Sequence, residues 1–523
     1  MRTFGQVALL AATVAASQPT QTENLVHYAH ADVYGPHPGA HYAHADMYGP
    51  HPAGLHYSHA DVYAHPAPVD VHYATPAPVV AHYAEPVVHH DVVHHDVVHH
   101  APDVVHEHTV VHTAGDRSDA HRTFEEICEE NGFAFEIHEV TTDDGYILNV
   151  FRIPGLAAEQ VSESVEYHGS RNVSKPPILM QHGLFDSAYC WIVNYGDIAP
   201  AFVAARAGYD VWLGNSRGNT FSRHHNHLDP DHDEKKFWDF TWKDMGKYDL
   251  PAVIDMIQSE TGYQKVAYIG HSQGTTQMYS ALAEDPDFYA DKLSLFVALG
   301  PVTMIPHTDV GLMQFTSHFY DVVVDTADTL GVHEIGGMNW FTHGVADAFC
   351  VHIPEFCEAI MSLFVNHHPE IDDDDRFAVY AGHSPNGSSM KAIEHYTQNL
   401  KEARFQEFAD DYVSFFNKHE HRTTDLIPIE NATKTNIPIA MFTGVYDILA
   451  DLTDARWTRD QIKKNIVHYE EIEAGHLTFL VGKDMTYFTH SVMALLYEHH
   501  PLPKGNFHHH TSTHDSHWYN LLQ

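Results

Sequence analysis

Three side chains of this sequence could together carry out nucleophilic catalysis on an ester. Ser272 stands in the stretch Gly-His-Ser-Gln-Gly, between an apolar run and a helical pattern. A tight strand-to-helix corner of this kind exposes a serine hydroxyl, and flanking glycines keep the turn free of side chains. A serine nucleophile also needs a base and an acid that orients the base. Asp447 and His476 are the candidates, because each follows an apolar stretch later in the chain.

The acid is the least determined of the three, because Asp451 and Asp454 lie close behind Asp447 and could take its role. Asp447 is favoured because it stands nearest to the end of the preceding apolar stretch. His476 is favoured among the 50 histidines because it follows the last apolar stretch and a glycine.

An oxyanion hole would complete such a site with two backbone N–H groups. One is predicted at Gln273, directly after the nucleophile. The other is predicted at Leu184, in the turn after ILMQHG, where His182 and Gly183 let the chain bend towards the substrate.

The elements that must position these residues are short buried strands alternating with helices. The predicted strands lie in the stretches PPILMQHG, GYDVWLGN, KVAYIGHS, KLSLFVALGP, IPIAMFTG and NIVHYEEI. A hairpin is predicted before them, turning at Asp144 and Gly145. The alternation indicates an α/β fold with a mainly parallel sheet, and the order Ser, Asp, His is that of the α/β-hydrolase fold.

Residues 302–425 interrupt this alternation. They are rich in Phe, Met, His and acidic residues and contain few strand patterns. We therefore expect an inserted, mostly helical cap between the strand that leads to Ser272 and the strand that leads to Asp447. The stretch GNSRGN at 214–219 has neither the spacing nor the lysine of a phosphate-binding loop, and we expect a structural turn there.

The two ends of the chain have a different composition. Residues 1–17 combine an early arginine, a short apolar run and small residues, which is typical of a secretory signal peptide. Residues 18–120 form a His-rich, low-complexity segment with repeats such as HYAHADVYGPHP, for which we expect disorder. Residues 121–502 are predicted to be the hydrolase domain, and residues 503–523 form a His-rich tail.

The His-rich segment could bind divalent metal ions. It holds 20 of the 50 histidines between His27 and His112, and the run HHDVVHHDVVHH adds Asp91 and Asp96 as oxygen ligands. Neutral imidazoles bind Zn²⁺, Cu²⁺ or Ni²⁺ and release them when protonated. A solvated spacer is an equally supported interpretation. No cofactor and no firm metal site are predicted for the rest of the chain, which has no CxxC pair.

The charge balance excludes some partners. The chain has 28 Lys and Arg against 70 Asp and Glu, a formal net charge of −42, which disfavours nucleic acids and anionic membrane surfaces. Beyond the N-terminus no apolar run approaches the 18 residues of a membrane span.

The cysteines and the sequons agree with secretion. Cys350 and Cys357 could close a short disulfide loop, whereas Cys128 and Cys190 could be free or paired. The sequons, at Asn172, Asn386 and Asn431, are predicted glycosylation sites.

From Thr123 to Leu502 the chain resembles the acid lipase family of α/β-hydrolases, which includes gastric and lysosomal acid lipases and insect digestive lipases. The resemblance rests on the motifs QHGLFDSAYCW, AGYDVWLGNSRGNTFSRHH, FWDFTWKDMGKYDLPAVID, GHSQGTT, GVYDILAD and AGHLTFL, which occur in the family's order. It implies the triad Ser272, Asp447 and His476, the oxyanion donors Leu184 and Gln273, and a disulfide like that of Cys350 with Cys357. Cys190 and Thr478 depart from the family's pattern, and the His-rich tract is foreign to it.

Together these features predict a secreted serine lipase that hydrolyses triacylglycerols or cholesteryl esters at a lipid surface, with a lysosomal location as the alternative. Two other functions stay open. The chain could be a carboxylesterase for soluble substrates. It could also be a non-catalytic lipid-binding or matrix protein with a metal-binding His-rich tract.

Overall fold

The computed structural model describes residues 117–159, 175–311, 313, 317, 333–337, 368–410 and 424–503. The predicted signal peptide, the His-rich tail and most of the His-rich N-terminal segment lie outside these residues. The folded part begins slightly before the predicted boundary, because Ser118–His121 forms a 3-10 helix and Asp119 pairs with Arg376 at 3.0 Å.

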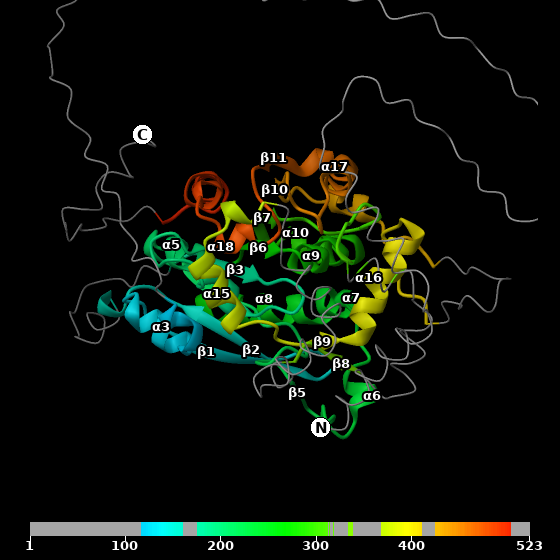
Figure 1. The fold of residues 1–523 in the computed structure, drawn as a ribbon, viewed down its shortest axis with the longest axis horizontal. Coiled ribbons are helices and arrows are strands. Elements are labelled where there is room, and N and C mark those ends of the chain that lie inside the picture. Colours follow the sequence, from blue (N-terminus) through cyan, green and yellow to red (C-terminus); the bar gives the residue numbers. More distant parts are fainter. Residues whose placement is uncertain are drawn as a thin grey trace, which may run out of the picture. The chain divides into compact units, whose positions relative to one another are not determined.

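The centre of the folded part is a mostly parallel β-sheet (Figure 1). Its strands lie in the order β1-β2-β4-β3-β6-β7-β10-β11, and β5 pairs with β2. The hairpin β1–β2 is antiparallel and turns at Gly145, and β2 runs antiparallel to β4. From β4 to β11 every pairing is parallel. The bounds are β1 Glu136–Thr141, β2 Tyr146–Ile153, β3 Pro177–Gln181, β4 Asp210–Leu213, β5 His224–His225, β6 Val266–His271, β7 Leu293–Leu299, β10 Ile439–Gly444 and β11 Ile466–Ile472. All the strands predicted from the sequence are confirmed.

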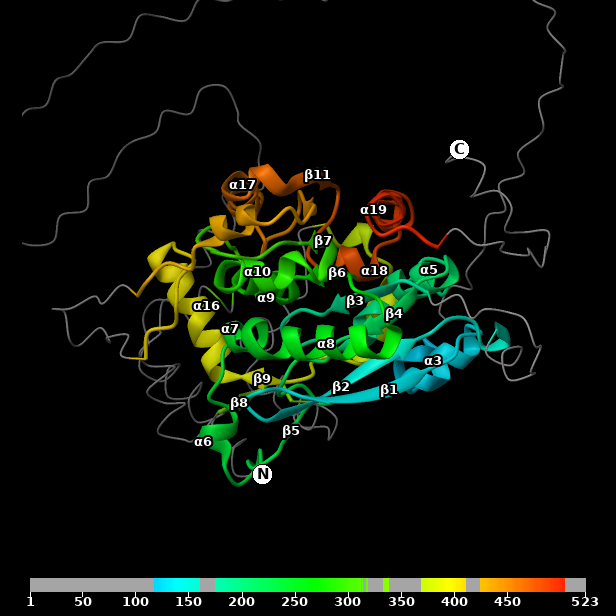
Figure 2. The same ribbon diagram turned by 180° about the vertical axis from the view of Figure 1, so that it is seen from behind.

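Both faces of the strands β3, β4, β6, β7 and β10 are buried, which explains why these strands are mostly apolar runs, whereas the edge strand β11 is only partly buried. Along β6, Ala267 and Ile269 enter one core, and Val266 and Tyr268 enter the core on the other face. The first core includes residues of α5 (Pro200–Arg206) and α19 (Met493–His499). The second includes α8 (Leu250–Thr261) and α9 (Gln273–Glu284). The result is a three-layer α/β-hydrolase fold, whose helices are visible on both sides of the sheet (Figures 1 and 2).

The remaining helices are shorter or lie at the edges. Their bounds are α3 Phe124–Glu130, α6 Glu234–Phe237, α7 Trp242–Asp244, α10 Pro286–Ala290, α15 Asp374–Gly382, α16 Met390–Glu402, α17 Leu452–Gln461 and α18 Thr478–Val481. Two π-helical turns, Met245–Asp249 and Tyr487–Val492, lead into α8 and α19.

Helices are the main regular elements in the described part of the predicted cap. Between β7 and β10 it contains α15 and α16, together with a small antiparallel pair of strands, β8 (Glu334–Ile335) and β9 (Ser388–Ser389). Cys350 and Cys357 fall outside the described residues, so their predicted disulfide stays a prediction.

Candidate active site

Ser272 sits at a strained corner between β6 and α9. Its backbone adopts φ 54° and ψ −120°, a conformation that residues with a side chain rarely take. The flanking glycines make the corner sterically feasible. A Cβ on Gly274 would lie 2.3 Å from the carbonyl oxygen of Gln181, and a Cβ on Gly270 would lie 2.8 Å from the carbonyl carbon of Gly274. The backbone therefore presents the Ser272 hydroxyl above the carboxyl end of the sheet.

The structure brings the three predicted residues together. The Ser272 hydroxyl lies 2.7 Å from His476 Nε2, and His476 Nδ1 lies 2.8 Å from Asp447 Oδ2. All three residues are buried, and each comes from a loop that follows a strand: β6, β10 or β11. In this arrangement the hydroxyl donates to the imidazole, and the imidazole donates to the carboxylate. This is the geometry that a serine nucleophile with its base requires.

Asp447 is held as an ionised acceptor. Its Oδ1 accepts hydrogen bonds from the backbone N–H groups of Leu449 at 2.9 Å and Ala450 at 2.8 Å. Burial alone would raise the pKa of Asp447, but the His476 imidazole and these N–H groups outweigh it and hold the pKa below its usual value. A permanent negative charge beside Nδ1 favours an imidazolium at His476 during proton transfer.

The two predicted oxyanion donors flank the nucleophile. Gln273 is the first residue of α9, and Leu184 lies in the turn after β3. Gly183 allows this turn to approach Ser272, because a Cβ on Gly183 would lie 3.0 Å from Ser272 Cβ. Phe185, directly after Leu184, also has a positive φ of 60°. Within the described part of the chain, neither the Leu184 nor the Gln273 N–H donates to a backbone acceptor, so both are available to an oxygen at Ser272.

His182 stabilises this turn in the neutral state. Its Nε2 accepts a hydrogen bond from Ser216 N–H at 3.0 Å, so its proton is on Nδ1, which donates to the carbonyl of Gly183 at 2.7 Å. Burial lowers the pKa of His182 to about 4, so the ring stays neutral in mild acid.

His271, directly before the nucleophile, is also a buried histidine. Its Nε2 donates to the His476 carbonyl at 2.9 Å, and burial lowers its pKa to about 3.

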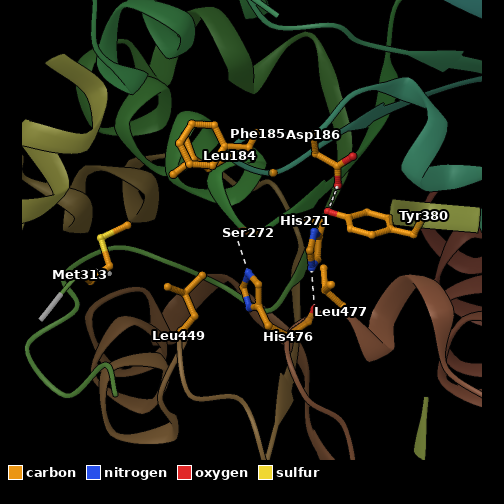
Figure 3. A pocket seen from close by; sticks show the side chains of 11 residues that line it. Leu184, Phe185, Asp186, His271, Ser272, Met313, Tyr380, Leu449, His476 and Leu477 are labelled. Atoms are coloured by element: carbon orange, nitrogen blue, oxygen red, sulfur yellow. Dashed lines mark hydrogen bonds between the residues drawn. The ribbon is translucent and has the colours of Figure 1, made fainter. Parts of the chain in front are cut away.

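A pocket opens beside the nucleophile (Figure 3). Figure 3 shows the apolar side chains Leu184, Phe185, Met313 and Leu449 on one side of Ser272, and Tyr380 and Asp186 on the other. The apolar side suits an acyl chain, because it offers hydrocarbon contacts and no competing hydrogen bonds.

Asp186 is a buried acid at the edge of this pocket. Its Oδ1 accepts from Ser187 N–H at 2.8 Å, and its Oδ2 accepts from the Tyr380 hydroxyl at 3.2 Å. Burial raises the pKa of Asp186 to about 7, although these hydrogen bonds and that of Cys190 oppose the rise. The side chain is therefore neutral in mild acid.

The alternative acids have other roles in the structure. Asp451 caps α17 by accepting from Thr453 N–H at 2.7 Å. Asp454 lies 2.7 Å from His307 Nδ1. Only Asp447 of the three carboxylates is hydrogen-bonded to His476.

The GNSRGN stretch is a structural turn, as the sequence predicted. Arg217 is buried and pairs with Asp144 at 2.6 Å and Asp249 at 2.8 Å, which ties the first hairpin to the start of α8. Burial would lower the pKa of Arg217, but the two carboxylates outweigh it, so the ion pairs persist.

Cys128 and Cys190 are both buried free thiols, so of the two alternatives that the sequence left open, free or paired, the structure has the free form. Burial raises the pKa of both thiols, so neither is a reactive thiolate.

The asparagines of the predicted glycosylation sites differ in their burial. Asn386 is buried at 1% exposure, and its side-chain amide donates to Ser187 Oγ at 3.1 Å. A glycan on this amide nitrogen would displace the contact, so the burial of Asn386 disfavours glycosylation at that predicted site. Asn431 is half-buried and donates to the Ala283 carbonyl at 2.7 Å, and Asn172 lies outside the described residues.

No group of three or more His, Cys, Asp or Glu side chains in the described residues is placed to hold a metal ion. In the same residues, no helix is long and apolar enough to span a membrane.

Two family models match the chain. A model described as a partial alpha/beta-hydrolase lipase region covers residues 124–195, and a model of the alpha/beta hydrolase fold covers residues 176–483. The gastric triacylglycerol lipase of Mus musculus is 35% identical over 361 residues, which is 68% of this chain and 86% of the lipase. The lysosomal acid lipase/cholesteryl ester hydrolase of Homo sapiens is 34% identical over 365 residues, 69% of this chain and 86% of that enzyme.

The chain belongs to the acid lipase family of α/β-hydrolases. As an acid lipase it is a carboxylic ester hydrolase, and membership agrees with a secreted or lysosomal location. A further relative, lipase lipl-1 of Caenorhabditis elegans, is 34% identical over 67% of this chain.

Sequence reasoning missed three residues of this acid lipase site. His182 was predicted only as part of the bend that lets the chain approach the substrate, and its hydrogen bonds to Gly183 and Ser216 were not predicted. Asp186 was not singled out, although an acid between Phe185 and Ser187 in an otherwise apolar motif was a signal. The contact of Asp186 with Tyr380 could not be found from the sequence, because 194 residues separate the two.

Proposed function

We propose that this protein is a secreted or lysosomal serine lipase that hydrolyses neutral lipid esters, either triacylglycerols or cholesteryl esters. The observation that carries the proposal is the continuous hydrogen-bonded chain from Ser272 through His476 to Asp447 beside an apolar pocket. The names of two relatives, a triacylglycerol lipase and a cholesteryl ester hydrolase, support the substrate class.

In the proposed reaction Ser272 Oγ attacks the ester carbonyl carbon while His476 Nε2 takes its proton. The carbonyl oxygen becomes an oxyanion, which accepts hydrogen bonds from the N–H groups of Leu184 and Gln273. The imidazolium then protonates the leaving alcohol as the ester bond breaks, which leaves an acyl-serine. Water, deprotonated by the same histidine, releases the fatty acid and restores Ser272.

The mostly neutral surroundings of the triad suit work in mild acid. His182 and His271 stay uncharged down to about pH 4 and about pH 3, so neither adds positive charge next to His476 in that range. Asp186 is protonated there and adds no negative charge beside the oxyanion turn.

The test is hydrolysis by the purified full-length protein of triolein emulsion, cholesteryl oleate and soluble p-nitrophenyl butyrate between pH 4 and pH 8. The serine variant Ser272→Ala is the control, and its turnover should fall by a factor of about 10⁵ or more. Equal activity of the folded variant would refute the proposal. Hydrolysis of the soluble ester alone would favour a carboxylesterase, and no hydrolysis at all would favour a lipid-binding protein.

A further inference from the structure

A short extended segment before α15 lies along the turn that follows the base. Residues Ile371–Asp373 pair with Val481–Lys483 through two backbone hydrogen bonds: Asp373 N–H to the Val481 carbonyl at 2.8 Å, and Lys483 N–H to the Ile371 carbonyl at 3.0 Å. Asp372 and Gly482 form a β-bridge between these two bonds. This contact joins the predicted cap, in which α15 lies, to the loop that carries His476.

A side-chain relay extends from this contact to the residue before the base. The Thr478 hydroxyl donates to Asp372 Oδ1 at 2.6 Å and accepts from the N–H of Gly475 at 2.9 Å. Thr478 and Asp372 are 5% and 6% exposed. The buried carboxylate fixes the direction of the hydroxyl proton, and a lone pair of the hydroxyl is thereby aimed at Gly475. Gly475 directly precedes His476, so these two hydrogen bonds fix the position of the backbone from which the imidazole extends.

The other end of α15 reaches the opposite side of the nucleophile. The Tyr380 hydroxyl donates to Asp186 Oδ2 at 3.2 Å. Asp186 ends the oxyanion turn, which its own N–H closes on the Gly183 carbonyl at 3.4 Å. Figure 3 shows Tyr380 and Asp186 meeting beside His271, within reach of the pocket.

We propose that the segment Ile371–Gly382 is a positioning element that holds the two halves of the active site at a fixed separation, with Asp372 and Thr478 holding the His476 loop and Tyr380 holding the oxyanion turn. The proposal deepens the function proposed above and rests on it. Asp372 and Thr478 lie outside the pocket lining and act through the His476 loop, so they are positioning residues. Tyr380 lines the pocket, and its positioning role is therefore tested by amide exchange in the oxyanion turn.

A positioning role predicts a change in kcat rather than in KM. Attack and protonation depend on the distance and direction from Ser272 to His476 and to the two N–H donors, and a displacement of about 1 Å can cost about 100-fold in rate. Ground-state binding of an acyl chain depends on the apolar wall of the pocket, which the element does not form at Asp372 or Thr478. Loosening the element should therefore lower kcat and leave KM unchanged.

The experiment compares substitutions that remove single hydrogen bonds. Thr478→Val keeps the side-chain shape and removes the hydroxyl, whereas Thr478→Ser keeps the hydroxyl. Tyr380→Phe removes the bond to Asp186. Tyr195→Phe is the matched control, because its hydroxyl bonds to Asp373 of the same segment at 3.4 Å without reaching the site. Each full-length variant is assayed with p-nitrophenyl butyrate, and its melting temperature and amide hydrogen exchange are measured.

We expect Thr478→Val to lower kcat between about 10-fold and about 100-fold at unchanged KM. Thr478→Ser should restore kcat to within about threefold, and Tyr195→Phe should keep wild-type kinetics. Amide exchange should rise in Ala474–Leu477 for Thr478→Val and in Gly183–Ser187 for Tyr380→Phe. Wild-type kcat in Thr478→Val, or an equal loss in Thr478→Ser, would overturn the proposal.

The exchange measurement separates this proposal from the function on which it rests. If the wild-type protein hydrolyses no ester, the proposed function fails, and protection of the two loops still decides whether the element holds them. Unchanged exchange in both loops would refute the positioning role even in an active enzyme.

Discussion

At the scale of single residues, Asp447, the proposed acid of the triad, differs from Asp451 and Asp454 in the hydrogen bonds that it accepts. Asp447 accepts three hydrogen bonds, one from His476 and two from backbone N–H groups. An asparagine at this position would turn its N–H₂ group either to the imidazole or to the two backbone N–H donors. In each orientation the hydrogen bond on the side that faces the N–H₂ group would be lost. The histidine would then take the wrong tautomer for accepting the Ser272 proton.

We therefore expect Asp447→Asn to lower kcat by a factor of about 10³ to 10⁴ on a soluble ester. The matched control is Asp454→Asn, which removes a carboxylate seven residues away that pairs with His307. Its kcat should stay within a few-fold of the wild-type value. A larger loss in Asp454→Asn than in Asp447→Asn would assign the acid to Asp454.

A second residue-scale prediction concerns Asp186 and pH. In the unfolded chain this carboxyl titrates near its ordinary pKa of 3.8, and in the folded protein burial raises the pKa to about 7. Between these values the folded protein keeps a proton that the unfolded chain has released. Its contribution to the free energy of unfolding is therefore largest below about pH 4 and is lost as the pH rises to about 7.

Asp186→Asn cannot ionise, so it should become more stable relative to the wild type as the pH rises from 5 to 8, by on the order of 1 kcal/mol per pH unit at most. Denaturant unfolding of both proteins at pH 5, 6, 7 and 8 measures this difference. The buried histidines His182 and His271 have lowered pKa values and give the opposite slope, a loss of stability as the pH falls below 6.5. They are present in both proteins and cancel in the comparison. A difference that does not change with pH would show that Asp186 is not a buried neutral acid.

At the scale of elements, the corner between β6 and α9 depends on the close approach of two backbones. A Cβ on Gly274 would lie 2.3 Å from the Gln181 carbonyl of β3, and a backbone atom cannot move aside as a flexible side chain can. The adjacent strand and the helix would have to separate, and the Ser272 hydroxyl would move with them.

Gly274→Ala should therefore destabilise the protein by at least about 2 kcal/mol and lower kcat more than 10-fold. Gly262→Ala is the control at another helix end, where φ is +74° and no atom lies within 4 Å of an added Cβ. It should cost about 1 kcal/mol through backbone strain alone and leave kcat unchanged. Thermal unfolding and kcat on a soluble ester measure both effects, and full activity in Gly274→Ala would contradict this account of the corner.

The same scale shows how far the sequence could predict the structure. The strands β3, β4, β6, β7 and β10 were predictable because each is a short, mostly apolar run that is buried on both faces. The edge strand β11 is only partly buried, and it was predictable from its β-branched and aromatic residues. The placement of Ser272, Asp447 and His476 followed from the rule that parallel strands end at one edge. Contacts between segments far apart in the chain were not predictable. The pairing of Asp372 with Thr478 joins residues 106 positions apart, and no local pattern signals it. The burial of Asn386 was hidden for the same reason, because a sequon specifies three residues and not their surroundings.

At the scale of the whole molecule, every group assigned to catalysis lies between Gly183 and His476. Removal of residues 18–116, with the predicted signal peptide retained, should therefore leave kcat and KM for p-nitrophenyl butyrate within about twofold of the full-length values. Loss of hydrolysis in a folded truncated protein would show that the division of the chain is wrong.

The distance along the chain between Ser272 and His476 also has a consequence for biosynthesis. The two residues are 204 positions apart, and β11, the strand before the histidine, is the last strand of the sheet in the sequence and lies at its edge. Translation at about 5 to 20 residues per second places the serine outside the ribosome roughly 10 to 40 s before its base. During that interval Ser272 lacks the base that we propose for it. We therefore expect a chain that ends anywhere before His476 to have no esterase activity, so that activity begins only when the chain is nearly complete.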